Sequence, residues 1–135
     1  MQYYEDILKR NNLKATQQRM QILKIIDRFG HISIETLIAH LKDMHSTVSL
    51  NTIYVNLEAL KKENIITELA IQNKKKHFEI TKDKHIHLIC NKCDSILDKF
   101  IDEKFFTIVE NEINNTGFKP TRKDLSVYGL CESCK

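Results

Sequence analysis

The sequence predicts an α+β protein in which an N-terminal winged-helix domain precedes a small α/β domain built around a four-cysteine zinc site. Three observations predict this fold. Apolar residues recur at helical spacing before residue 63, two short apolar runs flank a polar tip at residues 72–76, and two Cys-x-x-Cys pairs follow residue 89. A hydrophobic content of 41% over 135 residues supports packed cores rather than disorder.

Three predicted helices come first, and each begins at a hydroxyl residue. Thr16 can accept hydrogen bonds from the first amides of a helix whose broad apolar face ends at Gly30. Ser33 opens a second apolar helical segment in the same way, and Ser49 opens a third. Three helices are therefore predicted before residue 63.

A hairpin is predicted after the third helix. Residues 65–71 are rich in β-branched side chains, and residues 77–80 are apolar again. Between them lies a basic tip that contains Lys74 and Lys75. Three helices followed by a hairpin is the order of a winged helix, in which the third helix enters the DNA major groove. The basic tip can lie along DNA phosphates.

A short charged link at residues 81–84 is predicted to separate two domains. Residues 1–80 form a winged-helix DNA-binding domain, and residues 85–135 form a dimerisation and metal-binding domain. The second domain has about 50 residues, a size at which an apolar core alone gives marginal stability. Zinc binding and dimerisation would each supply the stability that this core lacks.

The second domain is predicted to contain three strands and one helix. Residues 85–90 and 95–100 read as strands with Cys-Asn-Lys-Cys between them. Asp102 can cap a helix that ends at Gly117, and residues 125–130 supply the third strand before the last cysteine pair. Both cysteine pairs therefore flank strands.

The four cysteines are predicted to hold one structural Zn²⁺. Cys90 and Cys93 form one pair, Cys131 and Cys134 form the other, and the two-residue gap lets both sulfurs of a pair face one ion. Four thiolates at about 2.3 Å complete a closed tetrahedral site with no open position for catalysis. A redox dithiol is the alternative, but a redox Cys-x-x-Cys usually opens a helix, whereas these pairs flank strands.

A second metal site is indicated by His85 and His87, because alternate residues of a strand project from the same face. Asp98 on the partner strand can add a carboxylate, and Glu79 and His31 are further candidates from the first domain. Imidazole and carboxylate ligands suit Fe²⁺, Mn²⁺ or Zn²⁺. Spacing alone does not force His31 or Glu79 near the strand pair. The remaining histidines are expected to be ordinary surface residues: His40, His45 and His77.

Composition argues against several classes of protein. No apolar run reaches the roughly 18 residues of a membrane span, and the N-terminus lacks a secretion signal, so a cytoplasmic protein with reduced thiols is expected. A zinc enzyme with a small-molecule substrate is not expected, because the closed site uses both cysteine pairs. The net charge of +3 is compatible with nucleic-acid binding. A metal-storage protein or metal chaperone without a DNA role is the rival class.

Four segments match the pattern of a known family: LKATQQRMQIL at 13–23, SLNTIYVNLEAL at 49–60, HIHLICNKC at 85–93 and YGLCESC at 128–134. Over nearly its whole length the chain resembles the ferric uptake regulator family. The resemblance implies a winged-helix DNA-binding domain, a hinge and an α/β dimerisation domain. It also implies a homodimeric repressor that binds double-stranded operator DNA while a regulatory metal is bound.

The resemblance also implies functional residues. Structural Zn²⁺ is held by Cys90, Cys93, Cys131 and Cys134, and regulatory Fe²⁺ or Mn²⁺ by His31, Glu79, His85, His87 and Asp98. Together with Lys75 of the wing tip, the implied DNA contacts are Lys14, Arg19, Ser49, Asn51, Thr52 and Tyr54. Tyr54 and its neighbours would lie in the major groove, and Lys14 and Arg19 near phosphates or the minor groove. One departure is Gln17, where the family motif has proline, so a rigid helix start becomes an ordinary one.

The resemblance also bears on the effector. Iron sensors of the family often carry a further metal site at positions that here hold Lys84, Ile86 and Lys123, so that site is expected to be absent. Peroxide sensors tend to carry aspartate at the position of Asp98, where iron sensors tend to carry glutamate. The resemblance therefore implies a peroxide-responsive repressor. An iron-responsive repressor is the alternative, because Glu79 is of a type also common in iron sensors.

Overall fold

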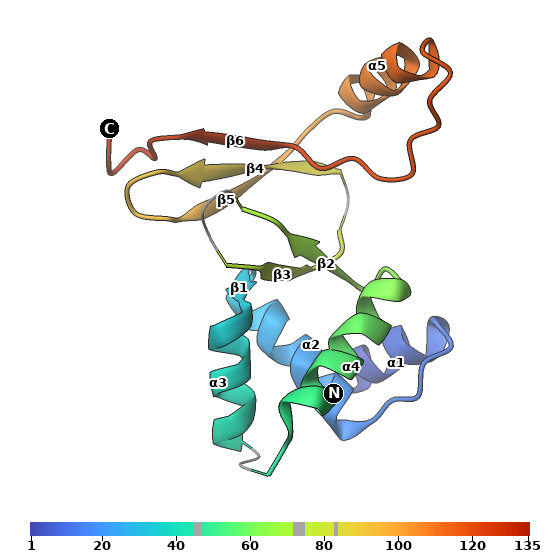
Figure 1. Cartoon of the computed structure of the whole chain (residues 1–135), viewed down its shortest axis with the longest axis vertical. Helices are drawn as coiled ribbons and strands as arrows, with labels where there is room; N and C mark the ends of the chain where they lie inside the picture. Colours follow the sequence, from blue (N-terminus) through green and yellow to red (C-terminus); the bar gives the residue numbers. More distant parts are fainter. Residues whose placement is uncertain (45–46, 72–74, 83) are drawn as a thin grey trace. The chain divides into compact units, whose positions relative to one another are not determined.

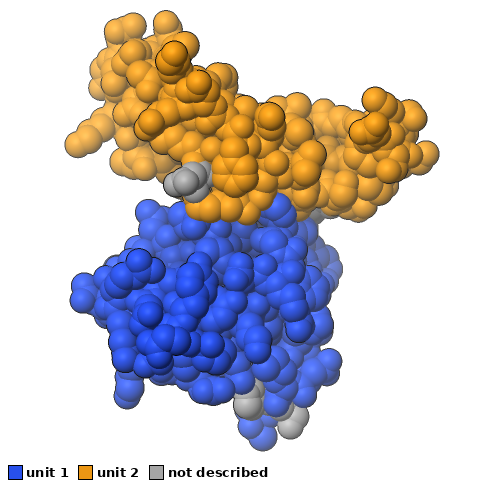
Figure 2. Space-filling model, turned by 180° about the vertical axis from the view of Figure 1, so that it is seen from behind, with its two compact units in different colours: residues 1–81 blue, residues 82–135 orange. Residues whose placement is uncertain are grey.

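The computed structural model describes the chain except residues 45–46, 72–74 and 83. The described residues form two compact units, Met1–Thr81 and Lys82–Lys135, which are coloured separately in Figure 2. His45 and Lys74 lie outside the described residues, as does position 83 of the predicted link. The mixture of helices and short sheets confirms the predicted α+β class. Among the described helices, none is both long and apolar enough to cross a membrane.

In its described residues, the first unit contains four helices and a three-stranded antiparallel sheet (Figure 1). Its elements are α1 (Gln2–Arg10), α2 (Gln17–Phe29), β1 (Ile32–Ser33), α3 (Ile34–Met44), α4 (Leu50–Lys62), β2 (Ile66–Leu69) and β3 (His77–Ile80). The strand order is β1-β3-β2, and Thr67 of β2 lies opposite Glu79 of β3. The predicted order of three helices and a hairpin is therefore present from α2 onward.

The three predicted helix starts are confirmed. The side-chain oxygens of Thr16, Ser33 and Ser49 each accept a hydrogen bond from a backbone N–H in the following helical turn, at 3.1 to 3.2 Å. These bonds satisfy amides that have no acceptor within the helix. Gly30 ends α2 with a φ of 77°, a conformation that glycine adopts because it has no Cβ. Local sequence thus determines where α2, α3 and α4 begin.

Helix α1 is an addition to the three predicted helices. Its Leu8 is fully buried in the core of the first unit, and the Tyr4 hydroxyl donates to the Asp27 carboxylate of α2 at 2.8 Å. Burial and this carboxylate raise the pKa of Tyr4 to about 12. A helix of 9 residues is too short to be stable alone. Packing against α2 therefore holds α1, which explains why local sequence did not reveal it.

The core of the first unit lies between its helices and its sheet. Buried side chains come from α2, α3, α4 and the strands: Ile22, Leu23, Ile26, Leu37, Ile53, Leu57, Leu60, Ile66 and Phe78. Full burial of one side chain of this kind contributes about 1.5–3 kcal/mol. The core therefore fixes α4 against the rest of the unit and leaves Asn51 and Tyr54, near the start of α4, exposed to solvent.

In its described residues, the second unit contains one three-stranded sheet and one helix. Its elements are β4 (His85–Cys90), β5 (Ile96–Phe100), α5 (Glu103–Asn114) and β6 (Ser126–Gly129), with strand order β5-β4-β6. The Asp102 carboxylate accepts from the Lys104 N–H at 2.9 Å, which confirms the predicted cap. The helix ends at Asn114 rather than at Gly117, because the chain leaves it through a turn in which the Gly117 N–H donates to the Asn114 carbonyl at 3.0 Å.

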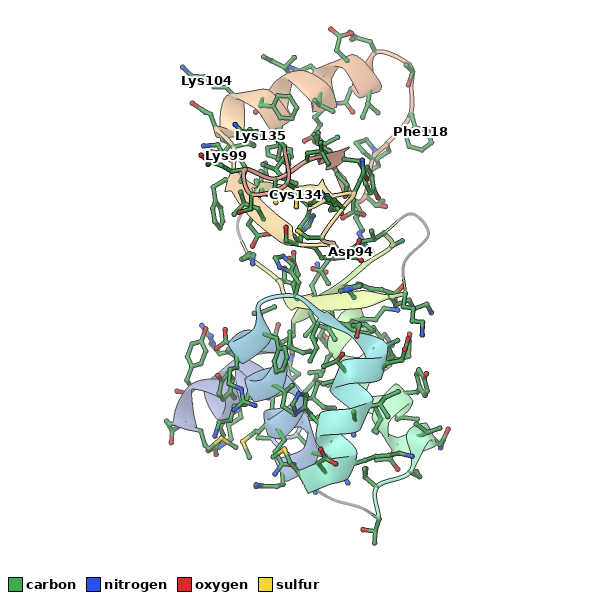
Figure 3. The ribbon with its side chains drawn as sticks, turned by 90° about the vertical axis from the view of Figure 1, so that its left-hand side faces the viewer. Asp94, Lys99, Lys104, Phe118, Cys134 and Lys135 are labelled. Carbon is green, nitrogen blue, oxygen red and sulfur yellow. The ribbon has the colours of Figure 1, made fainter. Side chains whose placement is uncertain are left out.

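The second unit leaves much apolar surface uncovered. The buried apolar residues in its described part are Ile89, Cys90 and Phe106. Large apolar side chains remain exposed on β5, α5, β6 and the adjoining loops: Leu97, Phe100, Phe105, Ile108, Phe118, Leu125, Val127, Tyr128 and Leu130. Figure 3 shows Phe118 at the outer edge of the loop that follows α5. Large exposed apolar surface is typical of protein–protein interfaces.

Candidate metal centres and nucleic-acid interface

The four cysteines of the second unit converge on one point. The Sγ atoms of Cys90, Cys93, Cys131 and Cys134 all lie within 4.8 Å of one another, and Figure 3 labels Cys134. Cys93 Sγ and Cys131 Sγ are 3.7 Å apart. Four sulfurs bound to zinc at about 2.3 Å would be separated by about 3.8 Å. The four thiols therefore fit a tetrahedral Zn²⁺ site.

Strand direction explains this convergence. Strands β4 and β6 are parallel neighbours, with Cys90 opposite Gly129, so both cysteine pairs follow the same edge of the sheet. The Asn91 N–H donates to the Gly129 carbonyl at 2.7 Å and ties the two turns together. Sequence reasoning paired the strands at residues 85–90 and 95–100 but did not place the third strand. The parallel β4–β6 pair is what brings the two cysteine pairs side by side.

Backbone amides prepare Cys90 to bind a metal as a thiolate. The N–H groups of Cys131, Cys93 and Lys92 donate to Cys90 Sγ at 3.4 to 3.5 Å and lower the pKa of Cys90 to about 6. A hydrogen bond with Cys131 and burial raise the pKa of Cys134 to about 12. A cation is therefore needed to hold all four sulfurs as thiolates, the form that binds zinc.

Two histidines and one aspartate of the second unit form a separate group. His85 and His87 lie on one face of β4, with their Nε2 atoms 3.1 Å apart. Asp98 lies opposite His87 in the β4–β5 register, and its Oδ1 is 3.7 Å from His85 Nε2 and 3.6 Å from His87 Nε2. His87 is only 6% exposed. Imidazole nitrogens and a carboxylate oxygen thus point toward one position, as a divalent ion requires.

His31 and Glu79 form a pair within the first unit. His31 Nε2 lies 3.0 Å from Glu79 Oε2, and Glu79 is 1% exposed. A carboxylate buried to this extent needs a hydrogen-bonded or positive partner. Glu79 lies on β3, whose partner β1 begins directly after His31. The β1–β3 pairing therefore brings His31 beside Glu79 within the first unit.

The first turn of α4 presents polar side chains to solvent. Asn51 and Tyr54 are exposed, and the Ser49 and Thr52 hydroxyls lie 2.9 Å apart. An open depression of about 340 Å³ adjoins this turn, lined by Gln17, Gln18, Thr47, Val48, Ser49 and Thr52. Because the first amides of a helix carry partial positive charge, this surface suits an anionic, polar partner such as DNA.

Arg19 is held by an asparagine that sequence reasoning did not single out. Arg19 Nε donates to Asn56 Oδ1 at 3.1 Å, and its Nη1 donates to the Lys14 carbonyl at 3.1 Å. Asn56 is only 8% exposed, and it shares the buried face of α4 with Ile53 and Leu60. A polar residue on an apolar helix face was the available signal. Asn56 thus links α4 to the arginine expected near DNA.

Lys75 is an exposed lysine of the described part of the wing. Its ammonium forms an ion pair with Glu35 of α3, and both side chains are more than half exposed. Exposed pairs of this kind contribute at most about 1 kcal/mol. A phosphate could therefore replace Glu35 as the partner of Lys75 at little cost.

The positions of the further metal site found in iron sensors hold no cluster of ligands in the described structure. Lys84 Nζ lies 3.9 Å from Glu103, and Lys123 Nζ lies 3.3 Å from Glu110. Ile86 lies between the two histidines of β4 and offers no ligand atom. These three positions thus hold two lysines and an isoleucine, none of which offers an imidazole or carboxylate ligand.

Two histidines outside the metal groups make ordinary contacts. The His40 ring meets the Phe29 ring edge-on, with centroids 5.0 Å apart. His77 Nδ1 lies 2.7 Å from the Lys75 carbonyl oxygen. Both side chains are half-buried.

Comparisons with known proteins agree with this geometry. A model of the ferric uptake regulator family matches residues 10–128. The peroxide-responsive repressor PerR of Staphylococcus saprophyticus is 30% identical over 129 residues, covering 95% of this chain and 86% of that protein. The ferric uptake regulation protein of Campylobacter upsaliensis is 29% identical over 140 residues, covering 99% and 88%. In the solved structures, the Campylobacter jejuni peroxide stress regulator matches with a TM-score of 0.75 and 32% identity, over 96% of this chain and 97% of that one.

Proposed function

This chain belongs to the ferric uptake regulator family of metal-responsive transcriptional repressors, and we propose that it binds operator DNA as a homodimer while Fe²⁺ or Mn²⁺ occupies a regulatory site. It is a regulator rather than an enzyme. The observation that carries the proposal is the convergence of His85, His87 and Asp98 in the second unit, together with the buried His31–Glu79 pair in the first.

In this proposal the first unit binds DNA. Helix α4 enters the major groove, where Tyr54 reads bases and its neighbours Ser49, Asn51 and Thr52 also contact the DNA. The exposure of Tyr54, at 47%, supports this assignment. The remaining contacts are basic and face phosphates or the minor groove: Lys14, Arg19 and Lys75.

The second unit forms the dimer in this proposal. Its exposed apolar side chains on α5 and β6, such as Ile108 and Val127, would be covered by a second copy of the chain. Structural Zn²⁺ at the four cysteines would hold the sheet that carries this surface. A dimer matches a two-fold symmetric operator because each copy supplies one α4.

The regulatory ion is proposed to couple the two units. His31 and Glu79 precede the link at residues 81–84, whereas His85, His87 and Asp98 follow it. One ion that takes ligands from both sets would hold both copies of α4 at operator spacing. The ion shifts this balance only through its higher affinity for the DNA-binding form. Ligands from both units are therefore required for the switch.

Hydrogen peroxide is proposed as the signal. Aspartate at position 98 supports this choice over a purely iron-responsive repressor. Bound Fe²⁺ would activate peroxide, and a ligand histidine, His31 or His85, would exchange a ring C–H for C–OH with water as the other product. The modified ring binds metal more weakly, so the ion leaves and DNA is released. Mn²⁺ would support DNA binding without this reaction.

Mass spectrometry tests the peroxide proposal. The manganese-loaded protein first selects a duplex from an AT-rich pool. The iron-loaded protein is then bound to this duplex and treated with dilute peroxide. We expect His31 or His85 to gain one oxygen while the protein releases the duplex. The manganese-loaded protein should keep unmodified histidines and stay bound to the duplex. If the histidines stay unmodified while duplex binding follows free Fe²⁺, the chain is an iron-responsive repressor. Asp98→Glu should keep metal-dependent binding and blunt the peroxide response.

A further inference from the structure

Lys82 contacts one of the proposed regulatory ligands. Its Nζ lies 2.5 Å from Asp98 Oδ2, and the two side chains are 31% and 16% exposed. The other carboxylate oxygen of Asp98, Oδ1, faces His85 and His87 at 3.7 and 3.6 Å. One oxygen of Asp98 therefore faces the imidazoles, and the other is held by an ammonium group.

We propose that Lys82 competes with the regulatory ion for Asp98 and thereby sets the affinity of the site. The proposal rests on the proposed function, because it takes Asp98 as a metal ligand. A divalent ion that binds Asp98 must either displace the Lys82 ammonium or remain close to its positive charge. Both alternatives weaken metal binding, since like charges a few ångströms apart repel each other.

Displacement of the Lys82 ammonium from Asp98 costs enough free energy to weaken metal binding, but little enough for the ion to bind reversibly. Lys82 is about one-third exposed, so its long side chain can carry the ammonium into water without burying a charge. Partly exposed ion pairs contribute modestly to stability. We therefore expect competition by Lys82 to lower metal affinity by about three- to tenfold.

The position of Lys82 in the chain gives this competition a further consequence. Lys82 is the first residue of the second unit and directly follows Thr81, the last residue of the first. While Lys82 is paired with Asp98, the start of the second unit is tied to β5, which carries Asp98. Displacement of the Lys82 ammonium by the ion breaks this ion pair. The Lys82 side chain thus connects metal binding at Asp98 to the first residue of the second unit.

The control for the experiment is Lys99. It follows Asp98 on β5 and is exposed, and neighbouring residues of a strand project from opposite faces. Figure 3 labels this residue. Lys99→Ala removes the same charge as Lys82→Ala from a position next to Asp98 but on the other face of the sheet. A general effect of net charge would therefore appear in both variants.

The experiment is a titration of the zinc-loaded protein with Mn²⁺, which needs neither DNA nor peroxide. Lys82→Ala should bind Mn²⁺ about three- to tenfold more tightly than the unmodified chain, Lys82→Arg should remain close to it, and Lys99→Ala should be unchanged. Unchanged or weaker Mn²⁺ binding by Lys82→Ala, with zinc content and melting temperature retained, overturns the proposal. An equal gain in Lys99→Ala also overturns it.

A fourth variant separates this inference from the proposed function. Asp98→Ala should lose most of its Mn²⁺ affinity if Asp98 is a ligand. If Asp98→Ala binds Mn²⁺ normally, the proposed ligand set is wrong and the competition fails with it. If Asp98→Ala loses binding while Lys82→Ala gains none, the ligand set stands and only the role of Lys82 is wrong.

Discussion

The two units of this chain are stabilised in different ways. The first unit buries a continuous set of leucine and isoleucine side chains among its helices. In the described part of the second unit, the buried apolar residues are Ile89, Cys90 and Phe106, and large apolar side chains remain on its surface. One of those buried residues is a zinc-ligand candidate, and His87, a metal-ligand candidate, is buried near it.

This difference suggests a division of roles: the first unit holds the DNA-binding helix in place, and the second unit responds to bound ions. The first unit holds α4 with its own apolar core. The second unit buries the thiol of Cys90 and the imidazole of His87 in addition to Ile89 and Phe106. In the proposed function, Zn²⁺ and a second copy of the chain supply the stability that this small core lacks. Dependence on bound partners is what makes this unit suited to sensing.

Loss of a zinc ligand should cause the largest loss of stability, and this loss should be confined to the second unit. Cys93→Ser leaves three thiolates, and in small zinc domains the metal contributes about 10–16 kcal/mol of folding free energy. We expect hydrogen exchange to show lost protection in β4 and β6 with native protection in α2. Ser133→Ala, which changes the turn of the second cysteine pair without removing a sulfur, is the control. An intact dimer with native exchange in β4 would refute the structural role of zinc.

Substitution of an exposed apolar residue of α5 should affect association without affecting folding. Ile108 is 62% exposed, and burial of such a side chain in a dimer contributes about 1.5–3 kcal/mol. Ile108→Ser should therefore raise the dimer dissociation constant by about tenfold or more. Analytical ultracentrifugation measures this constant, and Asn111→Ala on the same helix is the control. Unchanged association in Ile108→Ser would remove α5 from the proposed dimer surface.

Substitution of Asn56, in the first unit, should have a smaller effect, and this effect should be on DNA affinity. Asn56→Leu removes the acceptor of the Arg19 Nε–H, and one hydrogen bond of this kind contributes about 1 kcal/mol. DNA affinity should fall about fivefold without loss of thermal stability. In combination with Arg19→Ala, the two losses should not add. Additive losses would show that Asn56 acts independently of Arg19.

The smallest effect is expected at the wing. Lys75→Ala should weaken binding to all duplexes about equally and lower the slope of log affinity against log salt by about 0.9. Tyr54→Ala should instead reduce the preference for the selected duplex over random DNA. Fluorescence anisotropy at several salt concentrations measures both quantities. Equal loss of preference in the two variants would contradict the division between base reading and phosphate contact.

Sequence alone predicted the features that depend on local residues. Thr16, Ser33 and Ser49 accept hydrogen bonds within a few positions of themselves, so their roles are visible in a short stretch of chain. The alternation of His85 and His87 around Ile86 likewise placed both imidazoles on one face of β4. These features need no knowledge of how distant segments pack.

The features that sequence did not reveal depend on contacts between distant segments. Helix α1 is held by packing against α2, and the Arg19–Asn56 hydrogen bond joins residues 37 positions apart. The two-residue strand β1 is too short to show a period, yet it brings His31 beside the strand that carries Glu79. Lys82 belongs to no sequence motif, and its ion pair with Asp98 joins residues 16 positions apart in the chain.

The central claim is that one regulatory ion couples the DNA-binding unit to the metal-binding unit. Calorimetric titration of Mn²⁺ into the zinc-loaded dimer, with and without the selected duplex, tests it most directly. Because coupling between two binding sites is reciprocal, DNA must tighten Mn²⁺ binding by the same factor by which Mn²⁺ tightens DNA binding, a factor of about 5–150 in typical cases. We predict equal factors within this range. A Mn²⁺ affinity that is the same with and without DNA would contradict the account.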